Sequence, residues 1–405
     1  MPDAQRASTQ PPAILVLSPE AHDQLGGLAS YLRGIVTALG PEHAVTFLGR
    51  ARATLSTHRP VRSTPTTADA SPHLTQLATR SRAEQIWQAL RWALRCRLRR
   101  QPTLTLCGHL HLAPLAVLVQ RLAGGRSLLV LLGLESWQAP SSPAARRAAS
   151  RFDRYVSVSR FTAERFGRWS GVDAGRIIVI PPAVDPEPFR RVTRDNVLSL
   201  RRELGIVDRP TLLTVARLDE VANRKGHHHV LGILPELRQS HPGLVYLIAG
   251  DGPGRSTLEQ QAATLSIADA VRFLGPVSEA RKAALFRLAN AFVLPSEGEG
   301  FGIVLAEAAI CRLPIVYSSL DASAEAVAGV ERCWSVDPRA KPQLLAALQD
   351  ALSSGAQAPA QAPAVRELPG CTPAAFGQAW RHAASQSALG DETLSSEETL
   401  PNSGS

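Results

Sequence analysis

The chain has 405 residues, more than one ordinary hydrophobic core accommodates, and this length indicates two domains. Apolar residues make up 44% of it and charged residues 20%, which excludes a largely disordered, collagen-like or coiled-coil protein. The formal net charge of +9 is unevenly distributed, because residues 1–190 hold 24 basic and 12 acidic side chains and the remainder holds 20 and 23.

Membrane-spanning, exported and disulfide-rich or zinc-binding proteins are not expected. Gln120, Arg121 and Arg126 interrupt the most apolar region, so no window offers the roughly 18 apolar residues of a membrane-spanning helix. Residues 1–12 lack the basic flank and apolar run of a secretory signal. The 5 cysteines are scattered without a Cys-x-x-Cys pair. We therefore expect a cytoplasmic protein.

Strand and helix patterns alternate along the first half of the chain. Strands are predicted at 14–17, 44–48, 104–107, 127–132 and 177–180, and helices at 31–39 and 162–168. Residues 51–81, rich in Thr, Ser, Ala and Pro, predict a long loop or an irregular insertion. Nearly continuous apolar strands that alternate with helices predict a parallel sheet covered on both faces.

A strongly basic helix is predicted from about residue 82 to residue 100. Ile86, Trp87 and Leu90 continue its helical pattern. Its arginines include Arg91, Arg95, Arg97, Arg99 and Arg100. Such a helix fits peripheral contact with anionic lipid at the inner face of a membrane, an anionic acceptor, or an ordinary solvated face. No nucleic-acid-reading module accompanies it, so no specific nucleic acid is expected.

The prolines of residues 181–188 predict a domain boundary, after which the alternation restarts. Strands are predicted at 212–215, 245–249, 271–273 and 291–294, and helices at 229–239, 256–265, 280–288 and 303–309. The predicted fold is therefore α/β, with two doubly wound Rossmann-like domains facing each other across a cleft. The expected organisation is a flexible N-terminus (1–12), two domains (13–190 and 191–370), a helix (371–385) and a disordered tail (386–405).

The most specific segment, PSEGEGFGIVLAE at 295–307, directly follows a predicted strand. Gly300 and Gly302 let the backbone approach a ligand closely, and they expose amide groups at a helix start that favours anions. Glu307 lies about two turns along that helix, where it could reach a diol such as ribose. Glu299 would face whatever the amides hold.

A second group of candidates carries positive charge. Arg217 stands at a strand end and Lys225 at the start of the next predicted helix, and Lys225 is one of only three lysines in the chain. Two cations at such a turn suit a diphosphate, whose charge they neutralise as it departs, without a metal.

Other candidates are less specific. The GDGPG loop at 250–254 mimics a dinucleotide fingerprint but also suits a tight turn. Gly27 follows the first strand and allows either close passage of a phosphate or a plain turn. His109 follows a strand and is either a crevice residue or structural. The tract at 227–229 has three adjacent histidines, which point in different directions on a helix and predict no metal site.

These segments together resemble the retaining nucleotide-sugar glycosyltransferases of family four, which have the GT-B architecture. The similarity covers about residues 13–385 and is densest over 211–325. The E-x7-E pattern matches Glu299 and Glu307, the Gly/Ala-Arg-Leu segment matches Arg217, and the Lys-Gly pair matches Lys225. Two domains, a nucleotide-sugar donor, a glycan or lipid-linked acceptor, and no cofactor or metal are what this resemblance implies.

The resemblance also implies roles for single residues. Arg217 and Lys225 would hold the donor diphosphate, with Gly27 near it, and Glu307 would hold the ribose. Glu299 would hold the transferred sugar, and His109 is a further catalytic candidate. The donor-binding residues would be Gly27, Gly252, Gly300, Phe301, Gly302, Ile303, Val304 and Glu307.

Two departures from the family pattern keep alternatives open. Relatives commonly carry a histidine beside the donor sugar where this chain has Leu132, and Arg312 stands where they usually have glycine. The leading hypothesis is a hexosyltransferase of cell-surface polysaccharide or glycolipid biosynthesis. The alternatives are a catalytically silent nucleotide-sugar-binding subunit and a dinucleotide-dependent oxidoreductase.

Overall fold

The computed structural model describes residues 11–20, 22, 27–50, 74–219, 224–354 and 364–389. Most of the segments expected to be flexible, 1–12 and 386–405, lie outside these ranges. The chain divides into two compact units: the first comprises 1–130, 141–156 and 377–405, and the second comprises 131–140 and 157–376. None of the helices in the described ranges is long and apolar enough to cross a membrane.

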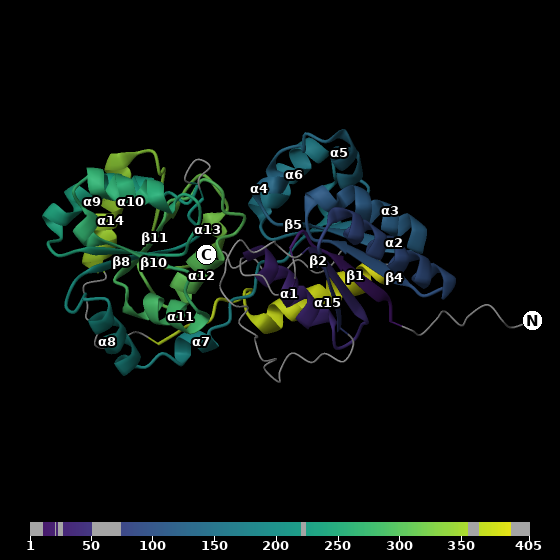
Figure 1. Cartoon of the computed structure of the whole chain (residues 1–405), viewed down its shortest axis with the longest axis horizontal. Coiled ribbons are helices and arrows are strands. Elements are labelled where there is room, and N and C mark those ends of the chain that lie inside the picture. The colour runs from purple at the N-terminus through teal and green to yellow at the C-terminus, as the bar shows by residue number, and fades with distance from the viewer. Residues whose placement is uncertain are drawn as a thin grey trace, which may run out of the picture. The chain divides into compact units, whose positions relative to one another are not determined.

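The first sheet contains seven strands within the described residues, in the order β3-β2-β1-β4-β5-β6-β7; β1, β2, β4 and β5 are labelled in Figure 1. The pairs β1–β2, β1–β4, β2–β3 and β4–β5 are parallel. The strands are β1 (Ala13–Leu17), β2 (Val45–Arg50), β3 (Leu74–Thr79), β4 (Thr103–Cys107), β5 (Arg126–Leu131), β6 (Arg154–Ser157) and β7 (Ile177–Val179). Every residue of β1 and β4 is buried, as expected for central strands covered on both faces.

The second sheet contains six strands of the described chain, and its pairings are all parallel. The strands are β8 (Thr211–Val215), β9 (Val245–Ala249), β10 (Val271–Gly275), β11 (Ala291–Leu294), β12 (Ile315–Ser318) and β13 (Cys333–Val336). Their order, β10-β9-β8-β11-β12-β13, is the strand order of a Rossmann fold.

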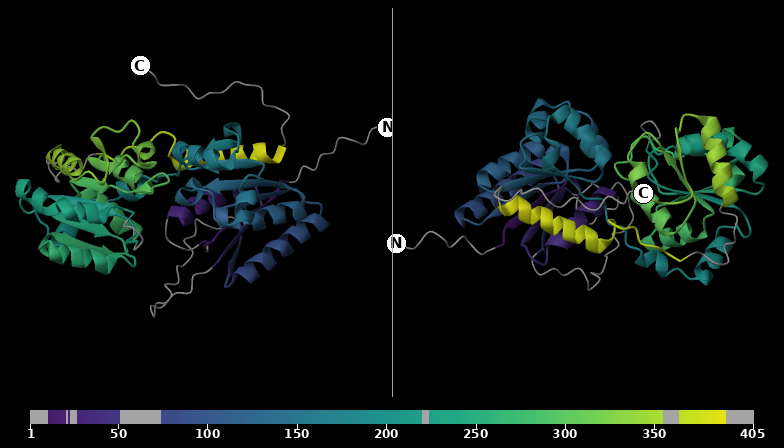
Figure 2. Two further views of the ribbon diagram at one scale, coloured as in Figure 1. Left: turned by 90° about the horizontal axis from the view of Figure 1, so that it is seen from above. Right: turned by 180° about the vertical axis from the view of Figure 1, so that it is seen from behind.

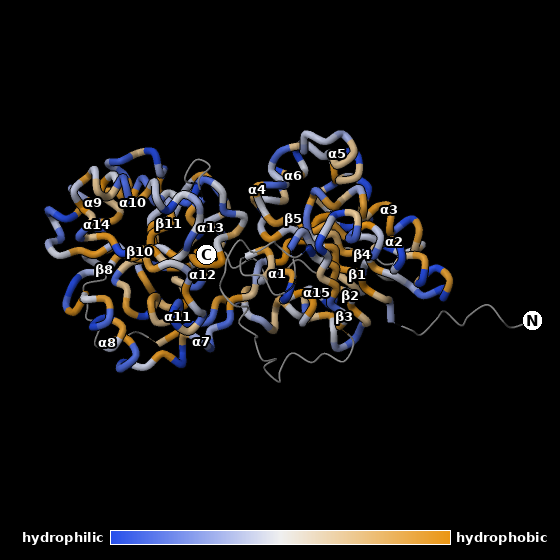
Figure 3. The backbone as a smooth tube through the Cα atoms, viewed as in Figure 1, coloured by the Kyte–Doolittle hydropathy of each residue, from blue (hydrophilic) through white to orange (hydrophobic). Residues whose placement is uncertain are grey.

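Helices connect the strands and cover the sheets. In the first half they are α1 (Gly27–Leu39), α2 (Arg82–Leu98), α3 (Ala113–Ala123), α4 (Leu134–Trp137), α5 (Pro143–Ala149) and α6 (Arg160–Ser170). They continue with α7 (Glu187–Arg190), α8 (Arg194–Glu203), α9 (His227–Ser240), α10 (Arg255–Thr264), α11 (Glu279–Leu288), α12 (Ile303–Ile310), α13 (Ser323–Ala326), α14 (Lys341–Ser354) and α15 (Pro373–Leu389). In Figure 3 the strands are mostly apolar, and the helices around them also contain many polar residues. The predicted α/β class with two doubly wound sheets is confirmed.

One sequence prediction is wrong in part. Residues 51–81 were expected to be irregular, yet Leu74–Thr79 forms β3 and pairs with β2 over its whole length. This strand lies at the edge of the sheet and most of its side chains are exposed or half-buried, so its polar residues hide the strand pattern. Residues 51–73 lie outside the described part of the chain.

The C-terminal helix α15 returns to the first unit. The ring of Trp380 meets that of Tyr31 in α1 edge-on, with their centroids 6.1 Å apart. Arg381 lies 3.8 Å from Glu42, beyond the end of α1. Figure 1 and Figure 2 show α15 alongside α1 from opposite sides. A helix was expected here, but the pattern did not indicate which sheet it would join.

Candidate functional site

The candidate residues of the second unit gather where its strand order reverses. Strands β8 and β11 are neighbours, but the chain continues from them toward opposite edges of the sheet. Ligands of open α/β sheets bind outside the carboxyl ends of the strands at this switch point. The loop after β8 carries Arg217 and Lys225, and the loop after β11 carries Glu299. We call the described residues of these loops, 216–219 with 224–226 and 295–302, the switch-point loops.

The two switch-point loops are packed against each other. The backbone N–H of Glu297 donates to the carbonyl of Arg224 at 2.7 Å. A Cβ on Gly226 would lie 2.1 Å from the carbonyl oxygen of Pro295, so only glycine permits this approach. Gly226 also has a φ of +74°, which glycine adopts without strain, and it begins α9.

Lys225 and Glu299 form an ion pair across this junction. Their side chains are 22% and 14% exposed, so the pair lies near the surface but is largely shielded. An ammonium group that faces a carboxylate here can exchange that partner for a phosphoryl oxygen of a ligand. Glu299 can then accept hydrogen bonds from hydroxyl groups. The two residues were predicted separately, and the structure brings them together.

Asp321 holds residues 295–302, which we call the glycine-rich loop, in place. It was not predicted from the sequence. It is buried, and its carboxylate accepts hydrogen bonds from the Ser296 hydroxyl at 2.7 Å and from the Glu299 backbone N–H at 2.8 Å. The N–H of Ser323 donates to its other oxygen at 3.0 Å. Burial raises the pKa of Asp321, although these hydrogen bonds lower it. A prediction of β12, after which Asp321 lies, would have drawn attention to it.

Glu307 lies on α12, which begins at Gly302 with a left-handed φ of +92°. The residue is 7% exposed, and its Oε1 accepts from Lys282 Nζ at 2.6 Å. Lys282, on α11, also pairs with Glu279 at 2.8 Å. Burial raises the pKa of Glu307, and Lys282 opposes that rise. Lys282 is another of the three lysines of the chain, and no role was predicted for it from the sequence.

The second carboxylate oxygen of Glu307 has a different environment from the first. Oε2 is buried and makes no hydrogen bond to any residue that the structure describes. A buried acceptor without a donor is costly, and a ligand hydroxyl would relieve that cost. The arrangement therefore suits a diol, as the sequence analysis expected for Glu307.

Arg217 lies on the other switch-point loop and is mostly exposed. Its guanidinium group donates to Asp219 Oδ1 at 2.7 Å, with 66% of the arginine side chain exposed. Asp219 is its partner among the described residues, and because the arginine is mostly exposed its guanidinium group can exchange this carboxylate for another anion. Its proposed role in binding diphosphate stays a prediction.

The GDGPG loop supports the segment that carries Arg217. A Cβ on Gly250 would lie 2.0 Å from the carbonyl oxygen of Ala216, and one on Gly252 would lie 2.2 Å from that of Leu218. These glycines therefore permit contact between two backbones, in agreement with a tight turn. The donor-binding role of Gly252 stays a prediction. A dinucleotide fingerprint would follow β8, the first strand of this sheet in the chain, whereas the GDGPG loop follows β9.

The glycine-rich loop also approaches the segment that follows β5. A Cβ on Gly300 would lie 2.0 Å from the carbonyl oxygen of Leu132, and one on Gly298 would lie 2.6 Å from the Leu134 side chain. The N–H of Leu132 donates to Glu135 at 3.0 Å. Gly300 therefore allows close contact between protein segments, in addition to the ligand approach predicted from the sequence. The amides of Phe301, Ile303 and Val304 stay predicted donor contacts.

Gly27 and His109 belong to the first unit, at its own strand-order reversal between β1 and β4. Gly27 is the first residue of α1. His109 Nδ1 accepts a hydrogen bond from the His111 N–H at 3.2 Å. Burial lowers the pKa of His109 to about 4, with a smaller effect of His111. The imidazole is therefore neutral at pH 7 with its proton on Nε2, which makes it a hydrogen-bond donor.

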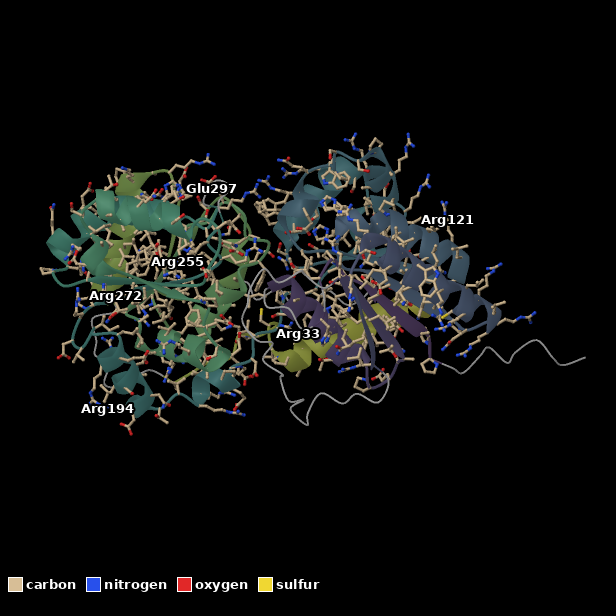
Figure 4. All side chains as sticks on the ribbon, in the orientation of Figure 1. Arg33, Arg121, Arg194, Arg255, Arg272 and Glu297 are labelled. Carbon is tan, nitrogen blue, oxygen red and sulfur yellow. The ribbon has the colours of Figure 1, made fainter. Side chains whose placement is uncertain are left out.

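The three adjacent histidines begin α9. His227 is buried, and burial lowers the pKa of His227 and of His228 to about 4. His229 Nε2 lies 3.8 Å from Glu297, which is labelled in Figure 4. Within the described ranges, no group of three or more His, Cys, Asp or Glu side chains is arranged to hold a metal ion.

Two family models match consecutive parts of the chain. The family described as Glycosyltransferase Family 4 matches residues 25–188, and that described as Glycosyl transferases group 1 matches residues 198–366. These segments cover the helices and strands that carry the candidate residues of each unit.

Two curated relatives share the name GDP-mannose-dependent alpha-(1-6)-phosphatidylinositol monomannoside mannosyltransferase. That of Mycolicibacterium smegmatis is 32% identical over 217 residues, which are 50% of this chain and 56% of the relative. That of Mycobacterium tuberculosis (strain CDC 1551 / Oshkosh) is 30% identical over 268 residues, 63% of this chain and 68% of the relative. The chain therefore spans 56% of the first relative's length and about two thirds of the second's.

The fold also matches solved structures. Anabaena HepE in complex with UDP superposes with a TM-score of 0.67 at 18% identity, covering 93% of this chain and 95% of that one. The expected pair of Rossmann-like domains of GT-B type is thereby confirmed. At this level of identity the likeness concerns the fold.

Proposed function

The chain belongs to the glycosyltransferases of group 1 and family 4, and on this premise we propose that it transfers a hexose from a nucleoside-diphosphate sugar to a glycan or lipid-linked acceptor. The observation that carries the proposal is the Lys225–Glu299 ion pair at the switch point of the second sheet. A site that binds both an anion and hydroxyl groups needs a cation and an acceptor side by side, and this pair supplies them. We propose that the transferred sugar retains the configuration of its anomeric carbon.

In the proposed reaction the cations act on the leaving group. Lys225 and Arg217 bind the diphosphate, and they stabilise the negative charge that develops on it as the bond to the sugar breaks. Two cations beside the diphosphate would neutralise its charge without a metal ion, and we propose metal-independent transfer. Asp321 holds the backbone of Glu299, which positions its carboxylate for the sugar hydroxyls.

Glu307 is proposed to bind the nucleoside. Its Oε2 is a buried acceptor without a described partner, and the ribose diol offers two hydroxyl donors. Lys282 donates to Oε1 and opposes the rise in the pKa of Glu307 that burial causes, which leaves Oε2 to accept from the ribose.

The names of the relatives suggest candidates for the donor base, the transferred sugar and the acceptor. Both mannosyltransferases are named as GDP-mannose-dependent and as acting on a phosphatidylinositol monomannoside. HepE was solved in complex with UDP. These names support a nucleotide sugar and biosynthesis of a glycolipid or polysaccharide.

A subunit that binds nucleotide sugar without turnover is the second candidate. It is favoured by Leu132, an apolar residue where relatives carry histidine, directly beside Gly300. His109 stays a candidate for the missing hydrogen-bond donor, because its neutral ring carries a proton on Nε2.

Donor binding tests the proposal first. Thermal unfolding should be measured with a panel of nucleotide sugars, because a ligand that binds the folded state raises the unfolding temperature. With the donor found in this way, Lys225→Ala and Arg217→Ala should each weaken binding or slow transfer by at least about tenfold, equivalent to about 1.4 kcal/mol. Lys341→Ala is the control. It alters the third lysine of the chain, which is exposed at the start of α14, and the variant should behave like the native protein.

The result also separates the candidate functions. Binding with transfer or slow hydrolysis supports the enzyme, and proton NMR of the product reports the anomeric configuration. Binding without turnover for any acceptor supports the silent subunit. Unchanged kinetics in both the Lys225 and Arg217 variants would refute the roles assigned to these cations.

A further inference from the structure

Exposed apolar side chains gather on two neighbouring helices of the first unit. The structure describes eight large hydrophobic residues with at least about a third of their surface exposed, and six of them lie on α2 and α3, which pack side by side (Figure 1). They are Ile86, Trp87, Leu94, Leu98, Leu118 and Leu122, and we call this surface the α2–α3 face. Such a concentration of exposed apolar residues marks an interaction surface.

Helix α2 has two apolar sides rather than one. Its buried residues, Gln85, Ala89, Ala93 and Cys96, recur every three or four positions and attach the helix to the domain. A second run, Ile86, Leu90, Leu94 and Leu98, recurs every four positions on another side. The exposed fraction is 43% at Ile86, 58% at Leu94 and 76% at Leu98, while Leu90 is half-buried. Packing within the domain therefore does not explain the second run.

Arginines border the apolar run. Exposed arginines on α2, directly after it and on α3 are Arg82, Arg91, Arg95, Arg97, Arg99, Arg100 and Arg121. Arg91 stacks over the Trp87 ring with its guanidinium carbon 5.1 Å from the ring centroid. Residues 82–123 contain a single acidic residue, Glu84. Its carboxylate accepts a hydrogen bond from the Arg80 N–H at 2.7 Å. The face is therefore both apolar and strongly cationic.

The charge determines which partner fits. A second copy of this chain would bring two arginine-rich faces together, and like charges oppose that contact. An anionic bilayer surface offers phosphate groups for the arginines and acyl chains for the leucines, and tryptophan is favoured at the boundary between them. Sequence analysis left open a lipid surface, an anionic acceptor or a solvated face; the exposed leucines favour the lipid surface.

We propose that the α2–α3 face binds peripherally to anionic phospholipid membranes, with Trp87, Leu94 and Leu98 inserted at the interface and the flanking arginines on lipid phosphates. Binding requires both features, because the arginines attract the protein to the surface and the apolar side chains hold it there. It is independent of the sugar-transfer proposal, since none of these residues belongs to the candidate site.

Sedimentation with vesicles tests the proposal on the full chain. The native protein should bind vesicles of phosphatidylcholine mixed with phosphatidylglycerol and bind pure phosphatidylcholine at least about tenfold more weakly, with added salt reducing the difference. Leu94→Ser with Leu98→Ser, and Arg95→Gln with Arg97→Gln, Arg99→Gln and Arg100→Gln, should each weaken binding to the anionic vesicles at least about tenfold.

Matched controls lie in the second unit. Val207 is 51% exposed and Arg194, labelled in Figure 4, is exposed on α8, so Val207→Ser and Arg194→Gln should bind as the native protein does. Because all altered side chains are exposed, the unfolding temperatures of the variants should match that of the native protein. Brominated lipids should quench tryptophan fluorescence in the native protein, and Trp87→Phe should remove most of that quenching.

Three outcomes would overturn the proposal. The first is no binding of the native protein to anionic vesicles. The second is native-like binding by either the leucine or the arginine variant, because the proposal requires both features. The third is a concentration-dependent dimer in light scattering that the leucine variant abolishes while vesicle binding is unchanged, because the face would then bind a second copy of the chain.

Discussion

Each glutamate of the Glu-x7-Glu pattern is paired with a lysine. Lys225 pairs with Glu299 across the switch-point loops, and Lys282 pairs with Glu307 between α11 and α12. Each lysine places a positive charge beside a shielded carboxylate in the absence of a ligand. The environments differ, because Glu307 is more deeply buried and retains one oxygen without a described partner.

Removal of Lys282 should leave Glu307 as a buried charge without compensation. Burial alone acts to lower the pKa of Lys282, but Glu307 and Glu279 outweigh it and raise that pKa. We expect Lys282→Met to lower the free energy of unfolding by about 3 to 5 kcal/mol, measured by urea denaturation.

A second variant shows whether the charge causes this loss. In Lys282→Met with Glu307→Gln the group that loses its lysine is Glu279, whose side chain is 71% exposed rather than buried, so the double variant should be more stable than Lys282→Met alone. If both variants lose the same stability, packing of the lysine stem rather than charge pairing accounts for the effect.

At the scale of elements, the contact between the two switch-point loops depends on the turn before α9. Gly226 combines a left-handed φ of +74° with a close approach to the carbonyl oxygen of Pro295. Any side chain here would push the turn that carries Lys225 away from the loop that carries Glu299. The geometry of the site therefore depends on one glycine that need not touch a ligand.

Gly226→Ala should lower the free energy of unfolding by at least about 2 kcal/mol, because it adds backbone strain and a clash. It should also weaken donor binding. Gly232→Ala is the matched control in the same helix: a Cβ there would meet no heavy atom of the neighbouring described residues within 4 Å, and alanine should stabilise the helix by about 0.5 to 1 kcal/mol. Native-like stability of Gly226→Ala would contradict the structure of this turn.

For the whole molecule, buried histidines should govern stability in mild acid. Burial is the main cause that lowers the pKa of His43, His109, His227, His228 and His229 below 6.5. A lowered pKa means that the unfolded chain binds more protons than the folded one below pH 6.5. Stability is therefore expected to be full above that pH and to fall as the pH drops toward 4.

His227 is the most deeply buried of these histidines, and its Nε2 has no hydrogen-bond partner in the described chain. With a pKa of about 4 when folded, it should contribute about 2 kcal/mol to the loss of stability between pH 7 and pH 5. His227→Leu should reduce that loss by this amount in urea denaturation at the two pH values. His382→Leu, which alters an exposed histidine of α15, should leave the native pH dependence unchanged.

The sequence by itself determined what depends on near neighbours along the chain. Alternating apolar runs and turn residues predicted most strands and helices, and they placed Arg217, Lys225 and Glu299 in loops after strands. They failed at β3, whose polar residues suit an edge strand, and they did not indicate the role of Asp321 because β12 was not predicted. Local patterns are informative because strand and helix periodicity is fixed within a few residues.

Only the tertiary structure decided which distant segments meet. Lys225 and Glu299 are 74 residues apart in the chain and pair because β8 and β11 are neighbours in the sheet. The contact of Lys282 with Glu307, the support of the glycine-rich loop by Asp321 and the return of α15 to α1 likewise follow from packing. Strand order and packing partners are selected by burial of whole apolar faces, so no short stretch of sequence contains that information.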